Sequence, residues 1–181
     1  MNTIKERRIV FTAGQIAERV RAMAAEIDAC YGDDPVVAVC VLKGAVFFFT
    51  DLVRAMRSEN LELDFVRLSS YGRGTSSSRH VVFSKDVDCD IAGKHVLIVE
   101  DVVDSGLSMQ FLMRQFEARG ARSLRLAALV DKNERREADV CVDFAGFKLE
   151  EGFIIGYGLD YAEKYRALPD VEELVFEPAA D

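Results

Sequence analysis

The chain has 181 residues, half of them hydrophobic, which suffices for one domain with a substantial core. Its formal net charge of −8 argues against a general nucleic-acid-binding surface. The sequence has no recognisable signal peptide and no apolar stretch long enough to span a bilayer, so it predicts a cytoplasmic protein without a membrane partner.

The cysteines and histidines do not suggest a metal centre. The four cysteines lie far apart and form no C-x-x-C pair: Cys30, Cys40, Cys89 and Cys141. Reduced thiols fit this spacing better than a disulfide framework or a zinc site. His80 and His95 have no neighbouring cluster of ligands, so a transition-metal site is not expected.

The first predicted helix begins after Thr12. Thr12 and Gln15 have the spacing of a capping box, and apolar residues then follow at helical intervals: Ile16, Val20, Met23, Ala24 and Ile27. This helix should stop near residues 31–35. A buried strand over 36–42, a helix over about 45–57 and a strand over 63–68 are expected next.

Residues 69–90 interrupt the alternation of strands and helices. The stretch 71–79 is small, polar and glycine-rich, which indicates a long mobile loop, and a short strand is predicted over 81–83. A loop of this length inside a compact domain is usually functional. A surface loop without a function is the open alternative.

Residues 96–113 carry the most informative pattern of the chain. The run 96–99 predicts a strand buried on both faces, and a helix should follow the next turn because apolar residues resume at helical spacing: Met109, Leu112, Met113 and Phe116. Ligands of parallel sheets bind beyond the carboxyl ends of strands, and free amides at a helix start attract anions. The turn 104–108 is therefore predicted to bind a phosphate. Glu100 and Asp101 suit sugar hydroxyls or a magnesium ion.

Gly120 should end this helix, and strands are predicted over 124–130, 140–144, 153–157 and 171–176. Strands that alternate with helices predict an α/β fold with a central parallel sheet. Polar groups would then meet at one edge of this sheet, from three strand ends: Lys43–Gly44, Glu100–Asp101 and Asp131–Lys132. A solvated loop would explain any one of these pairs. Three pairs beside an anion site favour a pocket for a phosphorylated ligand.

Residues 96–113 resemble the phosphoribosyl-pyrophosphate (PRPP) signature of the type I phosphoribosyltransferases, and the sequence Glu-Asp-Val-Val-Asp-Ser-Gly resembles their hypoxanthine-guanine branch. Four further segments match that branch in the same order, 42–45, 69–72, 129–132 and 153–161, and Arg166 follows at the expected remove. The resemblance implies the type I phosphoribosyltransferase fold, in which helices flank a central parallel sheet. It also implies one domain over 1–181, with a mobile lid over about 69–85 and a small hood built from the N-terminus and about 140–181.

The resemblance implies a pentosyltransferase of purine salvage. Such enzymes transfer the 5-phosphoribosyl group of PRPP to N9 of hypoxanthine or guanine in a Mg²⁺-dependent reaction, which yields IMP or GMP and pyrophosphate. Asp104 would be the general base near purine N7. The 5′-phosphate site would be the turn itself: Asp104, Ser105, Gly106, Leu107 and Ser108. Leu107 stands where some members have a lysine, so one phosphate-binding cation is absent here.

The same resemblance implies roles for residues around the turn. Glu100 and Asp101 would bind the ribose hydroxyls, directly or through Mg²⁺. Asp160, among the purine-binding residues, would hold a second Mg²⁺ on pyrophosphate. Pyrophosphate would contact Lys43, Gly44 and Arg166. The family often has a cis peptide before this lysine, which the sequence alone does not establish for Lys43. The purine would meet the Lys132 ammonium at O6, the Phe153 ring and the Ile154 backbone. The lid would include Ser70, Tyr71 and Gly72.

Structural interpretations of these residues stay open. Lys132 would then be a surface lysine, Phe153 and Ile154 core residues, Asp160 and Arg166 a surface ion pair, and Asp104 a helix cap.

Three other functions are also considered. A transferase for xanthine or a pyrimidine is one, although Lys132 and residues 153–160 argue against pyrimidines. A ligand-sensing regulator on the same fold is the second, and the presence of Asp104 and the lid argues against it. A receiver-like phosphoacceptor domain would leave residues 105–108 unexplained. The expected partners are PRPP, a 6-oxopurine and further copies of the chain in a dimer or tetramer.

Overall fold

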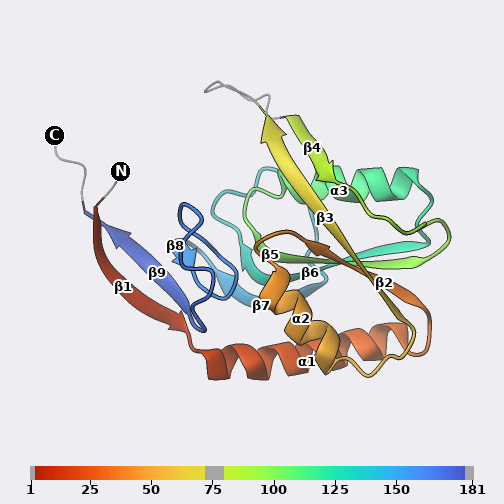
Figure 1. Cartoon of the computed structure of the whole chain (residues 1–181), viewed down its shortest axis with the longest axis horizontal. Coiled ribbons are helices and arrows are strands. Elements are labelled where there is room, and N and C mark those ends of the chain that lie inside the picture. Colours follow the sequence, from red (N-terminus) through yellow and green to blue (C-terminus); the bar gives the residue numbers. More distant parts are fainter. Residues whose placement is uncertain (1–2, 72–79, 178–181) are drawn as a thin grey trace.

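The computed structural model describes residues 3–71 and 80–177. Figure 1 shows a main body, in which helices flank a twisted sheet, and a smaller sheet at one end that carries both termini. In chain order the elements are β1 (Ile4–Phe11), α1 (Ala13–Tyr31), β2 (Val36–Val41), α2 (Val46–Ala55), β3 (Leu61–Tyr71), β4 (His80–Lys85), β5 (His95–Val103), α3 (Leu107–Ala118), β6 (Ser123–Lys132), β7 (Phe144–Leu149), β8 (Phe153–Ile155) and β9 (Val171–Phe176).

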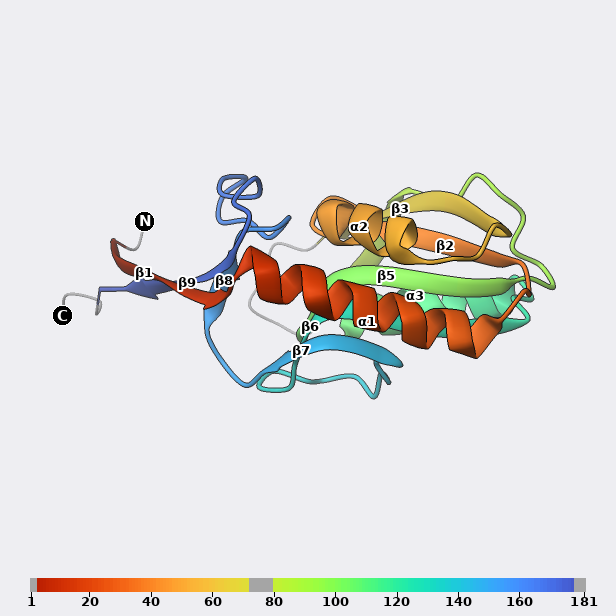
Figure 2. The same ribbon diagram turned by 90° about the horizontal axis from the view of Figure 1, so that it is seen from below.

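The main sheet has the strand order β4-β3-β2-β5-β6-β7. All neighbours pair in parallel except β4, which runs antiparallel to β3. The central strand β2 is apolar throughout because both faces of the sheet are covered there: every residue of β2 is buried. Leu97 and Val99 pack with α1 and α2, whereas Val96 and Ile98 pack with α3 on the opposite face. Figure 2 shows α1 and α2 together on their side of this sheet.

The start of α1 confirms the predicted capping box. The Gln15 amide donates to Thr12 Oγ1 at 3.3 Å, and the Thr12 amide donates to Gln15 Oε1 at 2.9 Å. The helix ends at Tyr31, and its buried face contains all five residues that the spacing indicated. The local sequence therefore fixes both the beginning and the orientation of this helix.

The small sheet is antiparallel, with the order β1-β9-β8. Ile4 pairs with Phe176 at one end of β1 and Phe11 with Val171 at the other. Both strands therefore bring the two ends of the chain together, as Figure 1 shows.

One predicted strand is wrong. The structure has no strand over residues 140–143, and β7 begins only at Phe144. Val140 is apolar because it packs in the core beside α3, while the Arg136 side chain binds its carbonyl group. Residues 140–143 therefore resemble a strand in sequence because Val140 is buried, and not because they pair with a neighbouring strand.

The arm around the predicted lid lies only partly within the described residues. Ser70 and Tyr71 end β3, and β4 extends the short strand predicted over 81–83. Gly72 and the following residues up to 79 lie outside the described part of the chain. Among the described helices, none has the length and apolar character needed to cross a membrane.

Candidate active site

The carboxyl ends of three adjacent strands meet at one edge of the main sheet, as predicted. β2, β5 and β6 are parallel neighbours, so Lys43–Gly44, Glu100–Asp101 and Asp131–Lys132 share that edge. Parallel sheets use this edge for ligands because loops and helix starts face it.

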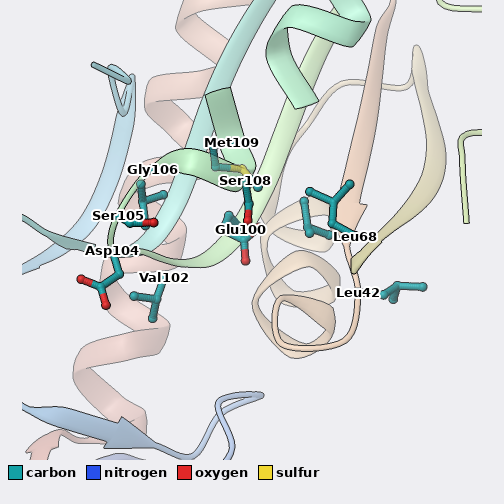
Figure 3. Close-up of a pocket in the computed structure, with 11 residues that line it drawn as sticks. Leu42, Leu68, Glu100, Val102, Asp104, Ser105, Gly106, Ser108 and Met109 are labelled. Carbon is teal, nitrogen blue, oxygen red and sulfur yellow. The ribbon is translucent and has the colours of Figure 1, made fainter. Parts of the chain in front are cut away.

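A cavity of about 280 Å³ opens there. Its polar wall comes from β5 and the turn before α3: Glu100, Asp104, Ser105, Gly106 and Ser108. Its apolar wall was not anticipated and consists of Val41, Leu42, Leu68, Val102, Val103 and Met109. Figure 3 shows the side chains of Glu100 and Ser108 close together, with Ser105 and Asp104 further along the turn. Leu107 is exposed and lies outside the lining.

The turn 104–108 leads directly into α3. Gly106 is the N-cap residue, with a φ of 78° that a side chain would disfavour. Asp104 is not the N-cap residue, so its interpretation as a helix cap is wrong, and the side-chain oxygen that accepts from the first amide of α3 is Ser105 Oγ, at 3.4 Å from the Leu107 nitrogen. The remaining free amides at this helix start can bind an anion.

The Asp104 carboxylate is instead left free. Its Oδ1 atom is buried and has no hydrogen-bond partner among the residues that the structure describes. A buried acceptor without a partner is costly, and such atoms in pockets commonly meet a ligand.

Glu100 and Asp101 form the acidic side of the site. The Asp101 amide donates to Glu100 Oε1 at 3.3 Å, and the Val102 amide to Asp101 Oδ1 at 2.8 Å. Burial, and then the nearby Asp101 carboxylate, raise the pKa of Glu100 well above its ordinary value. Within the described ranges, no group of three or more metal-binding side chains occurs. Two adjacent carboxylates nevertheless suit Mg²⁺, which proteins often hold by one or two carboxylates and substrate phosphates.

Gly44 joins the end of β2 to this acidic pair. A Cβ atom on Gly44 would lie 1.6 Å from Asp101 Oδ2, and one on Gly158 would lie 1.9 Å from the Gly44 carbonyl oxygen. The Leu42–Lys43 peptide is cis, a feature that the sequence had left open. These contacts bring the loop after β8 against the end of β2.

That loop also supplies an ion-pair cluster. Arg166 Nη2 lies 2.6 Å from Asp160 Oδ1 and 3.4 Å from Glu163 Oε2. Lys43 Nζ donates to the same Glu163 oxygen at 3.0 Å. The ion pair between Asp160 and Arg166 is therefore present. Glu163 escaped the sequence analysis, because only its spatial contact with Lys43 singles it out.

Lys132 is not the surface lysine, and Phe153 not the core residue, that the alternative interpretations of the sequence suggested. Lys132 is only 7% exposed, and its ammonium donates to the Gly152 carbonyl group at 2.8 Å, so it is not a surface lysine. Phe153 is 43% exposed and packs edge-on against Tyr161 and Phe176, two rings that the sequence did not single out. Ile154 is buried in the core, as its apolar side chain suggested.

Comparison with known proteins accounts for this arrangement. Residues 9–162 match the family profile described as "Phosphoribosyl transferase domain". The chain belongs to the phosphoribosyltransferase family.

Named phosphoribosyltransferases resemble it over most of their length. It is 41% identical to the hypoxanthine-guanine phosphoribosyltransferase of Bacillus subtilis, covering 90% of this chain and 89% of the relative. It is 43% identical to the hypoxanthine-guanine-xanthine phosphoribosyltransferase of Tritrichomonas foetus, covering 90% and 88%. A crystal structure of a Staphylococcus aureus hypoxanthine phosphoribosyltransferase matches with a TM-score of 0.89 at 35% identity, covering 95% of this chain and 92% of that one.

The expected fold class of this phosphoribosyltransferase is thereby confirmed. Its main sheet is mostly parallel with helices on both faces, and a Bacillus anthracis hypoxanthine-guanine phosphoribosyltransferase superposes with a TM-score of 0.86 at 37% identity over 95% of this chain and 99% of that one.

Proposed function

We propose that this phosphoribosyltransferase transfers the 5-phosphoribosyl group of PRPP to N9 of hypoxanthine or guanine, giving IMP or GMP and pyrophosphate. The reaction would serve purine salvage in the cytoplasm. The names of its relatives support this substrate class. One observation carries the proposal: Asp104, whose buried Oδ1 atom has no hydrogen-bond partner among the described residues, lines a pocket at the start of α3.

The turn 104–108 is the proposed site of the 5′-phosphate. Its backbone amides and the hydroxyl groups of Ser105 and Ser108 are donors that suit phosphate oxygens. Leu107, the first residue of α3, would contribute its amide, which in this structure donates to Ser105 Oγ at 3.4 Å. Gly106 allows this turn to form, because its φ of 78° is disfavoured for residues that carry a side chain.

Glu100 and Asp101 are proposed to accept hydrogen bonds from the ribose hydroxyls. They would also hold Mg²⁺, which would neutralise charge on the departing pyrophosphate. Lys43, Gly44 and Arg166 are proposed to contact pyrophosphate. A second Mg²⁺ at Asp160 would share that carboxylate with Arg166 and with the Glu163 amide, which donates to Asp160 Oδ2 at 2.8 Å.

The purine is proposed to lie between the Phe153 ring and the ribose, with the Ile154 backbone at its edge. Lys132 would donate to O6, and its buried position makes that donor selective: a 6-oxo group accepts a hydrogen bond, whereas a 6-amino group opposes the ammonium. Asp104 would take the proton from N7 as the bond from C1′ to N9 forms. Ser70, Tyr71 and Gly72 would begin a lid that excludes water from the oxocarbenium-like transition state.

A transfer assay tests this function. PRPP and Mg²⁺ are supplied with hypoxanthine, guanine, xanthine or adenine in turn, and nucleotide and pyrophosphate are quantified. We expect turnover with hypoxanthine or guanine, loss of turnover on chelation of Mg²⁺, and a fall in kcat of about 10² to 10⁴ in Asp104→Asn with PRPP binding retained. The exposed Asp139→Asn is the matched control.

If no base reacts although PRPP still binds, the result would favour a ligand-sensing regulator on the same fold over an enzyme. Preferential turnover of xanthine would instead identify the related transferase. A homodimer or tetramer is part of the proposal, and sedimentation of the assayed protein measures its mass.

A further inference from the structure

One guanidinium joins the segments that carry Asp104 and Lys132. Arg136 lies between β6 and β7, and its side chain is 19% exposed. Its donors contact carbonyl groups at 2.9–3.2 Å and one carboxylate: the carbonyl groups of Val103, Asp104, Lys132 and Val140, and the Asp131 side chain. Neither the family resemblance nor the strand-end pattern singled out this residue.

Backbone contacts reinforce the same junction. The amides of Glu137 and Ala138 both donate to the Ser105 carbonyl group, at 2.9 and 3.0 Å. A Cβ atom on Gly106 would lie 3.2 Å from the Ala138 carbonyl oxygen and 3.3 Å from Arg136 Cδ. Residues 136–138 therefore pack directly behind the turn that lines the pocket.

The contacts with Val103 and Asp104 orient two peptide groups of the turn. In a trans peptide the C=O and the following N–H point in opposite directions. Because both carbonyl groups face Arg136, the amides of Asp104 and Ser105 point away from it. The guanidinium thus fixes which way two donors of the turn are directed.

Arg136 also contacts the second segment, the one that carries Lys132. The Lys132 carbonyl group accepts from Arg136 Nη2, while the Lys132 ammonium reaches Gly152. Asp131, at the carboxyl end of β6, binds Arg136 and not the pocket, with its side chain 14% exposed. Asp131 therefore balances the charge of Arg136 and holds its fork in place.

We propose that Arg136 is a positioning residue that fixes the position of Asp104 relative to Lys132, and that the Asp131 carboxylate holds the Arg136 guanidinium in place. The inference rests on the proposed function, since those two residues are the proposed base and purine-binding cation. Arginine suits this task because its planar fork presents five donors in fixed directions. A lysine would keep the charge and contact far fewer of the same acceptors.

The test compares Arg136→Lys with Arg135→Lys, the adjacent and exposed arginine. Melting curves and the dissociation constant of PRPP are measured first, and then kcat and KM for hypoxanthine. We expect Arg136→Lys to fold and to bind PRPP within about tenfold of the parent, yet to lose roughly 10- to 100-fold in kcat. Arg135→Lys should match the parent in every measurement.

A double-mutant cycle separates positioning from plain stability. If Arg136 acts through Asp104, the double variant Arg136→Lys with Asp104→Asn should be no slower than Asp104→Asn alone. Asp131→Asn should reproduce part of the kcat loss of Arg136→Lys. Full additivity, or unchanged kcat in Arg136→Lys, would overturn the inference.

The parent enzyme in the same assay distinguishes the two levels of the proposal. Transfer by the parent with additive variants would reject only the role of Arg136. Absence of transfer by the parent with any base would reject the proposed function, and with it the role of Arg136.

Discussion

Glu163 accepts a hydrogen bond from Lys43 Nζ at 3.0 Å, and the same carboxylate oxygen lies 3.4 Å from Arg166 Nη2. One carboxylate thus sits between the two cations proposed to bind pyrophosphate. The hydrogen bond from Lys43 is the main reason why the pKa of Glu163 is lowered, so Glu163 stays ionised at neutral pH.

Glu163→Gln should therefore bind pyrophosphate more tightly, by roughly two- to fivefold, because a competing anion is removed from Lys43 and Arg166. Calorimetric titration with magnesium pyrophosphate measures the change, with the exposed Glu134→Gln as control. Weaker binding in Glu163→Gln would mean that Glu163 holds the two cations in their binding positions.

Lys132→Gln should impair recognition of the base while sparing PRPP. Because the ammonium is buried and would donate a charge-assisted hydrogen bond, we expect KM for hypoxanthine and guanine to rise by roughly 10- to 100-fold. The dissociation constant of PRPP should change little. Equal losses for base and PRPP would contradict a purine-specific role, and circular dichroism checks that the variant is folded.

Gly44→Ala should abolish activity through a steric effect. The new Cβ would lie 1.6 Å from Asp101 Oδ2, so the carboxylate or the end of β2 must move. We expect a loss of stability of about 1–3 kcal/mol and a marked loss of PRPP binding. Gly14→Ala is the matched control, because its Cβ would meet only Thr12 Oγ1, at 3.9 Å. Normal PRPP binding by Gly44→Ala would show that the contact with Asp101 is dispensable.

The free energy of unfolding should fall in acid as the Asp86 carboxylate becomes protonated. Two hydrogen bonds from Arg119, at 2.6 and 2.8 Å, lower the pKa of Asp86 below its ordinary value, although burial opposes them. The unfolded chain therefore binds the proton at higher pH than the folded protein does. The stabilisation is present above about pH 4 and is lost as the pH falls through the folded pKa.

Asp86→Asn removes this titration. Urea unfolding at pH 5 and pH 3 should show a smaller loss of stability in Asp86→Asn than in the parent. Asp139→Asn should behave as the parent does, since its side chain is exposed. Equal pH dependence in all three proteins would show that the ion pair with Arg119 does not affect acid stability.

The sequence was most informative where local composition determines structure. Residues 36–41 and 96–99 are buried on both faces of the sheet, so their uninterrupted apolar character predicted strands directly. The capping box at Thr12 likewise fixed the start of α1. The phosphate turn was predictable because an acidic strand end, a glycine and a helical spacing follow one another within one segment.

Features that depend on distant partners were not predictable. β1 is charged and mostly exposed, and its strand structure comes from pairing with β9. The buried ammonium of Lys132 finds its acceptor 20 residues away, in the Gly152 carbonyl group. Glu163 meets Lys43 across 120 residues of chain, and Arg136 meets Asp104 across 32, so no local pattern marks either residue.

The pairing of β1 with β9 also bears on how the protein is synthesised. β1 emerges from the ribosome before the rest of the domain, whereas its partner, residues 171–176, emerges only after β8. All six strands of the main sheet have been translated by residue 149, whereas Phe176, which packs on the Phe153 ring, is still to come. The face that presents Phe153 is therefore completed only once β9 has been translated, and a chain halted before β9 would lack it.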